Sequence, residues 1–262
     1  MIPLKDYNPT RTTPIVTLVL IAACIGVYFF VQPTIQTDPV QRVSSSACTN
    51  FRFNLDNAAI PYEITERRPL NEQEAETLLR AAGCGASESE LDSNPNKSVL
   101  LSIIYSMFLH GGFLHLAGNM LYLWVFGNNI EDTQGRFTYI VFYLLSGIAA
   151  TAAHVVLNLD SPIPIVGASG AIAGVMGAYL VLFPRVPIRS LIMFFLILFR
   201  DIEARWLLGF WFVSQFFINP NSGVAWAAHV GGFVFGVVAG LFWRGKRPPQ
   251  PQPYYAYDLP YR

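Results

Sequence analysis

Long hydrophobic runs without charged residues restrict the folds open to this chain more than any other feature. A helix that crosses a membrane needs about 20 mostly apolar residues. Of the 262 residues, 53% are hydrophobic and 13% are charged, and that charged share is roughly half of what a soluble domain carries. We therefore predict an all-α, polytopic membrane protein with six transmembrane helices, whose apolar segments are residues 14–31, 113–128, 137–157, 166–183, 206–218 and 224–243.

The first apolar segment follows a short polar stretch, residues 1–13, and we place the first transmembrane helix at residues 14–32. A cleaved signal peptide is the alternative for this segment. Its apolar part is long for such a peptide, and no A-x-A cleavage site follows it. We expect a retained helix.

A polar insert, residues 33–98, separates the first helix from the rest of the membrane segments. Within it, Asn71 followed three residues later by Glu74 is typical of the start of a helix, and Gly83 is typical of a helix end. We predict one short helix over residues 72–82.

Two of the three cysteines, Cys48 and Cys84, lie in this insert, while Cys24 lies in the first apolar segment. Disulfides persist in oxidising compartments. If the insert faces such a compartment, we expect Cys48 and Cys84 to be bonded; two unpaired thiols are the alternative.

The core of the protein is predicted to be residues 99–243, and residues 244–262 form a proline-rich, then tyrosine-rich tail that we expect to be disordered. Val99–Asn129 carries no Asp, Glu, Lys or Arg, but it is too long for one span and is divided by two glycines. We read residues 99–109 as a helix buried or half submerged in the membrane. Residues 189–199 are apolar but short, so we read them as an interfacial segment.

Basic residues predict the orientation of the six helices. An even number of spans places both termini on one side. The basic residues near the ends of the spans fall on that side: Lys5, Arg11, Arg136, Arg185, Arg189, Arg244, Lys246 and Arg247. Such residues favour the cytoplasmic side. We expect cytoplasmic termini, an extracytoplasmic insert and a location in the plasma membrane.

This topology brings four polar residues to a similar depth. His115 and Asn119 lie near the start of the second span, Ser169 starts the fourth, and His229 lies near the start of the sixth. All four are expected within the outer leaflet, at about 1.5 Å of rise per residue. Small residues share a helix face with Ser169 and with His229, which allows two helices to pack closely.

A serine and a histidine at one depth predict nucleophilic catalysis. Neutral His229 can accept the proton of the Ser169 hydroxyl, while His115, Asn119 and the backbone N–H of Ser169 can stabilise an oxyanion. Each residue alone has a plainer reading as a cap, a packing residue or a structural histidine, and we keep that reading for His110 and His154. The second, third, fourth and sixth apolar segments hold no Asp or Glu, so we infer a dyad without a carboxylate.

These residues stand in motifs that resemble the rhomboid family of intramembrane serine proteases. The matching motifs are His110-x4-His115-x3-Asn119, Glu131-x3-Gly135-Arg136, Gly167-x-Ser169-Gly170 and Ala228-His229-x2-Gly232-x3-Gly236. The resemblance implies a six-helix rhomboid-like bundle. The long first extracytoplasmic loop of this chain is a departure from the family, and its role is open. The resemblance also implies a serine endopeptidase that cleaves transmembrane segments of other proteins, with Ser169 as nucleophile, His229 as base, and His115 and Asn119 as oxyanion donors.

The chain departs from some family members at Ala173, where they carry an aromatic residue beside the catalytic histidine. What holds His229 in place is therefore open at this point. The alternatives are an inactive relative that binds transmembrane clients and a transporter or channel. We expect transmembrane substrates and a lipid bilayer as partners and no cofactor, metal or nucleic acid; the sequence predicts no oligomeric state.

Overall fold

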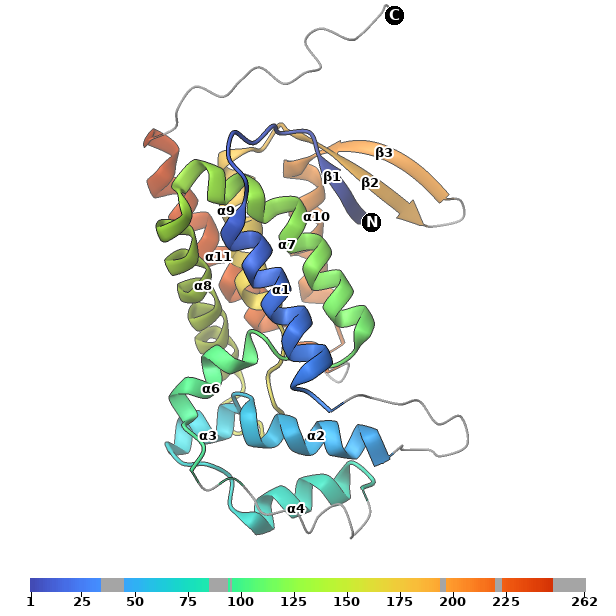
Figure 1. The fold of residues 1–262 in the computed structure, drawn as a ribbon, viewed down its shortest axis with the longest axis vertical. Coiled ribbons are helices and arrows are strands. Elements are labelled where there is room, and N and C mark those ends of the chain that lie inside the picture. Colours follow the sequence, from blue (N-terminus) through green and yellow to red (C-terminus); the bar gives the residue numbers. More distant parts are fainter. Residues whose placement is uncertain (34–44, 85–93, 95, 194–196, 220–222, 247–262) are drawn as a thin grey trace, which may run out of the picture.

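A computed structural model describes residues 1–33, 45–84, 94, 96–193, 197–219 and 223–246; the predicted tail thus lies almost entirely outside the described residues. Six helices occupy the six predicted apolar segments and pack into one bundle (Figure 1). They are α1 (Ile15–Phe30), α7 (Phe113–Gln134), α8 (Arg136–Leu157), α9 (Ser169–Leu182), α10 (Ala204–Ser214) and α11 (Trp226–Trp243).

The outer surface of this bundle is apolar. Two of its helices, α8 and α11, are long and apolar enough to cross a membrane, while α1 and α9 are apolar but have 16 and 14 residues. Large hydrophobic side chains are exposed along several helices, among them Val19, Phe137, Leu145, Trp206, Phe210, Leu241 and Phe242. Exposed apolar surface of this extent is unusual in a soluble monomer and suits a lipid environment.

Helix α9 lies at the centre of the bundle, and every residue from Gly170 to Tyr179 is buried. It packs on α11 through facing glycines. A methyl group added at Gly232 would meet the backbone of Gly170, and one added at Gly236 would meet that of Gly174. The two helices therefore touch backbone to backbone.

Some helix bounds differ from the prediction. Helix α7 continues past residue 128 to Gln134, because the carboxylate of Glu131 has a partner. It accepts hydrogen bonds from the backbone N–H groups of Val16 and Thr17, at 2.9 and 2.8 Å. These are first-turn donors of α1, which lack partners within their own helix. Helix α9 starts at Ser169, three residues late, because Gly167 adopts a non-helical φ of 120°.

The chain also contains a small antiparallel sheet, so the expectation of helices alone was incomplete. Strands β1 (Ile2–Asp6), β2 (Pro187–Met193) and β3 (Ile197–Glu203) pair in the order β1-β2-β3. Residues 189–193 and 197–199, which we read as part of an interfacial segment, lie in β2 and β3; their position relative to a membrane stays a prediction. Arg189 lies opposite Asp201, with Nη1 3.2 Å from Oδ1, so the charges that seemed to end an apolar segment belong to the second strand of a hairpin.

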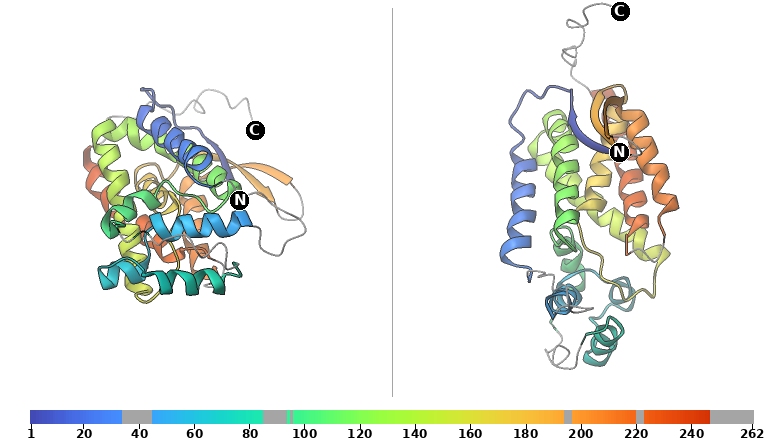
Figure 2. Two further views of the ribbon diagram at one scale, coloured as in Figure 1. Left: turned by 60° about the horizontal axis from the view of Figure 1, so that its bottom comes forward. Right: turned by 90° about the vertical axis from the view of Figure 1, so that its right-hand side faces the viewer.

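Three helices form what we call the insert subdomain: α2 (Ser45–Asn57), α3 (Pro61–Glu66) and α4 (Glu72–Ala81). It lies at the end of the bundle opposite the sheet (Figures 1 and 2). Helix α4 has the predicted capping box between Asn71 and Glu74, and Gly83 follows it with a φ of 84°. A disulfide joins Cys48 to Cys84. Helices α2 and α3 were not predicted.

The insert subdomain contacts the segment that leads into α9. The N–H of Ile165 donates to the carbonyl oxygen of Ala59 at 2.8 Å, and the N–H of Tyr62 donates to that of Ser161 at 3.0 Å. Helix α6 (Val99–Ser106), predicted over residues 99–109, joins this contact. Its Ser106 hydroxyl accepts from the N–H of Ala59 at 2.7 Å, and the Ser106 carbonyl accepts from the N–H of Gly167 at 2.9 Å.

Candidate active site

Ser169 is the first residue of α9, and the local backbone places its hydroxyl beside α7. Gly167 supports this turn with its φ of 120°, a conformation that side-chain-bearing residues rarely adopt. A methyl group at this position would lie 2.8 Å from both Cε1 and Nε2 of His115. Only glycine therefore lets the chain turn into α9 so close to the His115 ring.

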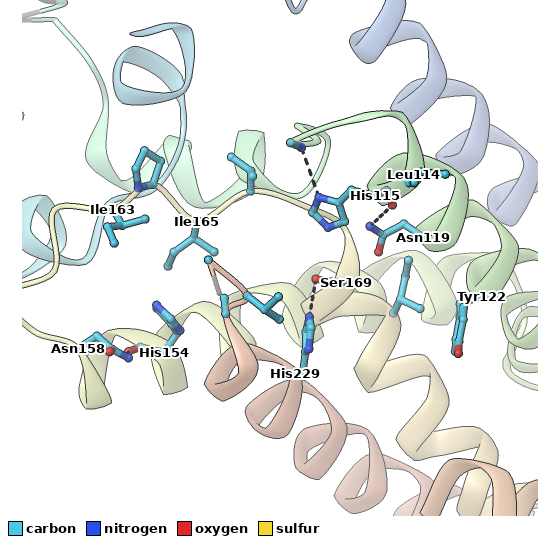
Figure 3. Close-up of a pocket in the computed structure, with 18 of the residues that line it drawn as sticks. Leu114, His115, Asn119, Tyr122, His154, Asn158, Ile163, Ile165, Ser169 and His229 are labelled. Carbon is cyan, nitrogen blue, oxygen red and sulfur yellow. Dashed lines mark hydrogen bonds between the residues drawn. The ribbon is translucent and has the colours of Figure 1, made fainter. Parts of the chain in front are cut away.

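His229 lies in the first turn of α11 and faces Ser169. Its Nε2 is 2.9 Å from the Ser169 Oγ, which is hydrogen-bonding distance (Figure 3). The contact follows from the packing of α9 on α11. Gly170 and Gly232, the neighbours of this pair along the two helices, have no side chains to hold the backbones apart.

The second ring nitrogen of His229 also has a partner, which the sequence did not predict. Nδ1 is 2.8 Å from Oε1 of Gln215, the first residue of the 3-10 helix η1 (Gln215–Phe217). The ring of Trp211 lies near the His229 ring, with centroids 5.8 Å apart. The sequence signal was a glutamine within a predicted apolar segment, where a polar side chain is a candidate functional residue.

His115 and Asn119 lie one turn apart on α7, as predicted. Nδ1 of His115 accepts from the backbone N–H of Gly111 at 3.3 Å. Asn119 donates one amide hydrogen to the carbonyl oxygen of His115 at 2.8 Å, which leaves the other for a ligand. Figure 3 shows both side chains on the same side of Ser169.

A cavity of about 610 Å³ joins these four residues. Its volume is within the usual range for ligand pockets. The walls are mostly apolar and come from α7, α8, α9, α10, the segment before α9 and the start of α11. His154, which we had read as structural, is one of the lining residues, together with Asn158. In the part of the chain that the structure describes, no three His, Cys, Asp or Glu side chains gather to hold a metal ion.

The remaining motif residues lie away from the Ser169–His229 pair. His110 is buried beside the cavity; its backbone N–H and carbonyl bond the side-chain amide of Gln32, at 2.9 and 3.1 Å. Glu131 lies twelve residues beyond Asn119 on α7, about 18 Å along the helix, and caps α1. Gly135 has a φ of 79° at the junction of α7 and α8, and Arg136 Nε lies 4.0 Å from Glu131 Oε1. These residues shape the fold and do not contact Ser169.

The structure is a helical bundle in which a serine and a histidine pair between two helices that pack through glycines. Comparison with known families identifies the class of membrane protein that has this arrangement. The Rhomboid domain model matches residues 97–246. The chain belongs to the rhomboid family.

Three relatives show the range of the family that the chain resembles. "Rhomboid protein 1, mitochondrial" of Saccharomyces cerevisiae is 32% identical over 151 residues, which cover 54% of this chain and 41% of the yeast protein. "Presenilin-associated rhomboid-like protein, mitochondrial" of Bos taurus is 31% identical over 172 residues, 60% of this chain and 43% of the bovine protein. "Rhomboid protease GluP" of Bacillus subtilis is 41% identical over 96 residues, 37% of this chain and 18% of that protein. The chain spans less than half the length of each of them.

Proposed function

We propose that this chain is an intramembrane serine endopeptidase that hydrolyses peptide bonds in or near transmembrane segments of other membrane proteins. The hydrogen bond between Ser169 Oγ and His229 Nε2, 2.9 Å long and inside a largely apolar cavity, carries this proposal. Family membership supports it, and so does the name of the Bacillus relative, which is called a protease.

The proposed reaction begins at this pair. The Ser169 oxygen attacks the carbonyl carbon of the scissile bond while His229 Nε2 takes the hydroxyl proton. The protonated histidine then gives that proton to the leaving amine, which yields an acyl-enzyme. Water, deprotonated by the same nitrogen, hydrolyses the ester and restores the serine.

Stabilisation of the oxyanion is assigned to α7 and to the start of α9. Because His115 Nδ1 accepts from the N–H of Gly111, a neutral ring carries its hydrogen on Nε2. That Nε2 lies beside Gly167 and close to the Ser169 side chain. The free amide hydrogen of Asn119 and the backbone N–H of Ser169 at the helix N-terminus complete the donor set.

The proposed substrates are single-span proteins cleaved near the outer membrane boundary at a small residue. A peptide bond within a helix must unwind before a nucleophile can reach it, and glycine or proline lowers that cost by about 1–3 kcal/mol. Replacing such helix breakers with leucine in a cleaved client tests this preference. Equal cleavage of a polyleucine span would contradict it.

The proposed topology has six spans, cytoplasmic termini and an extracytoplasmic insert subdomain. The plasma membrane remains our prediction for the location, although two relatives carry "mitochondrial" in their names and do not support it. Membrane-impermeant labelling of a single cysteine introduced at Thr77, on the exposed face of α4, tests the side. Fractionation of cells that express the chain tests the membrane.

The catalytic test uses purified protein in liposomes with a transmembrane reporter and a serine-directed fluorophosphonate. We expect Ser169→Ala and His229→Ala to lose cleavage and labelling while keeping their thermal midpoints, because a nucleophile and its base act as one unit. Ser102→Ala removes a buried serine of α6 outside the cavity and serves as the matched control. Normal cleavage by Ser169→Ala would refute the mechanism. A folded wild type that neither cleaves nor reacts would favour an inactive protein that binds transmembrane clients.

A further inference from the structure

We propose that Gln215 is a positioning residue that fixes the tautomer of His229, in the place where soluble serine proteases use a carboxylate. The catalytic role of Gln215 rests on the proposed function. The tautomer of His229, which is the position of one proton on its ring, can be tested independently of that function. Gln215 thereby explains how His229 is held when position 173 is alanine.

The contact is short and buried. Gln215 Oε1 lies 2.8 Å from His229 Nδ1, on the side of the ring opposite Ser169. Gln215 is 4% exposed. Helix α10 ends at Ser214 and the chain tightens into the 3-10 turn at this residue, beside the first turn of α11.

The orientation of the amide follows from its other contacts. The Gln215 Nε2 donates to the carbonyl oxygen of Trp211 at 2.9 Å and to the Ser214 hydroxyl at 3.3 Å. A carbonyl oxygen only accepts, so the nitrogen of the amide must face it. The amide oxygen is thereby left to face His229. An inverted amide would set two acceptors against each other at Trp211.

This orientation determines where the histidine carries its hydrogen. An amide oxygen cannot donate, so Nδ1 of His229 must carry the hydrogen that joins them. In a neutral ring Nε2 is then unprotonated, and its lone pair faces the Ser169 hydroxyl. The other tautomer would point an N–H at Ser169 and could not accept the serine proton.

The two histidines of the site thus hold opposite tautomers. The N–H of Gly111 donates to Nδ1 of His115, which leaves Nε2–H as a donor toward the proposed oxyanion. Gln215 accepts from Nδ1 of His229, which leaves Nε2 as a base. The same type of side chain serves two roles, because Nδ1 meets a backbone donor in His115 and an amide acceptor in His229. Among the described residues that line the cavity, none is Asp or Glu.

Nitrogen NMR of protein labelled with ¹⁵N-histidine tests the inference without reference to activity, because protonated and unprotonated ring nitrogens resonate far apart. The sample is the full chain in liposomes, with the His229 signals assigned by their absence in His229→Asn. We expect Nδ1–H for His229 and Nε2–H for His115, both in the wild type and in Ser169→Ala. Gln215→Met, which keeps length but removes the acceptor, should shift His229 toward a mixture of tautomers. Gln215→Glu keeps an acceptor for Nδ1 and should retain Nδ1–H, although its second oxygen loses the hydrogen bond to the Trp211 carbonyl.

Kinetics then distinguish positioning from packing. We expect Gln215→Met to lower kcat by about 10- to 100-fold with little change in KM. That loss is smaller than the roughly 10⁴-fold drop seen when a soluble triad is forced into the wrong tautomer. Gln215→Glu, which keeps the acceptor for Nδ1 but loses the donor to Trp211, should restore part of the rate. Gln73→Met, the same exchange on the exposed α4, is the matched control and should leave kcat unchanged.

An Nε2–H tautomer for His229 in folded wild type or in Ser169→Ala overturns the inference, and so does an unchanged tautomer in Gln215→Met. The Ser169→Ala spectrum decides the matter even if Gln215→Met fails to fold. An inactive wild type with the expected tautomers would refute the proposed protease activity and leave the assignment of Gln215 intact.

Discussion

The spacing between α9 and α11 should respond sharply to a single methyl group at Gly236. A Cβ at this position would press on the carbonyl oxygen of Gly174 and lie 2.6 Å from the carbonyl carbon and 2.8 Å from the Cα. Carbon atoms in contact normally stay about 3.5–4.0 Å apart. Gly236→Ala therefore requires the two helices to separate locally by about 1 Å. The three nearest atoms all belong to the backbone of Gly174, so no side chain can rotate away.

That separation acts on the reacting pair, which lies two turns away along α11. The Ser169–His229 contact is 2.9 Å long, and a shift of about 1 Å at a reacting group can cost on the order of 100-fold in rate. Overpacking of a core typically costs about 1–3 kcal/mol. We expect fluorophosphonate labelling to slow by about 100-fold and the thermal midpoint to fall.

Gly209→Ala is the matched control, since a Cβ added at Gly209 on α10 would meet no atom within 4 Å other than its chain neighbours and its own helix backbone. It should keep its labelling rate. Both rates are measured in the same liposomes at equal concentrations of folded protein. Wild-type labelling and stability in Gly236→Ala would refute the argument that backbone contact sets the distance between serine and histidine.

Three further results are expected. Asn119→Ala should slow cleavage by about 100-fold or less, because other oxyanion donors remain; an unchanged kcat would remove Asn119 from the site. Cys48→Ser opens a bond between residues 36 apart and should destabilise the insert subdomain by about 4 kcal/mol on a chain-entropy basis, measured by hydrogen exchange in α4; wild-type protection would contradict this. Burial raises the pKa of the Asp6 carboxyl in β1 from 3.8 to about 6. The folded protein therefore holds this proton more tightly than the unfolded chain, so stability should fall by about 2 kcal/mol as pH rises from 4 to 7. Asp6→Asn should flatten that slope, and parallel slopes would rule out the assignment.

Local chemistry made some features predictable from the sequence. The capping pair Asn71 and Glu74 defines the start of α4 through contacts within four residues, so no knowledge of the tertiary structure was needed. The approach of Ser169 to His229 was predictable for a different reason. Small residues recur on the faces that carry them, and such faces pack closely in membranes. Their catalytic roles stay proposals.

Other features depend on partners far away in the sequence. Strand β1 pairs with β2, with Ile2 opposite Leu191, and nothing near residue 2 indicates this partner. The charged residues of β3 gave the appearance of a break between apolar segments. The contact of Gln215 with His229 was not predicted, because it forms only where the end of α10 meets the start of α11. Nor does helix α2, with its polar residues, show a clear apolar stripe in the sequence.

The shortness of α9 has a consequence for the supply of water. Fourteen residues make a helix about 21 Å long, while the hydrocarbon layer of a bilayer is about 30 Å thick. If α9 ends at the cytoplasmic boundary, as the proposed topology implies, its first residue, Ser169, lies several ångströms below the opposite surface. Ser169 then lies below that surface, in the cavity that Ser161, Ile163 and Gly111 also line. Hydrolysis consumes one water molecule for each bond cut, and under the proposed topology a cavity at this depth would receive that reactant from the aqueous side, without a channel through the lipid.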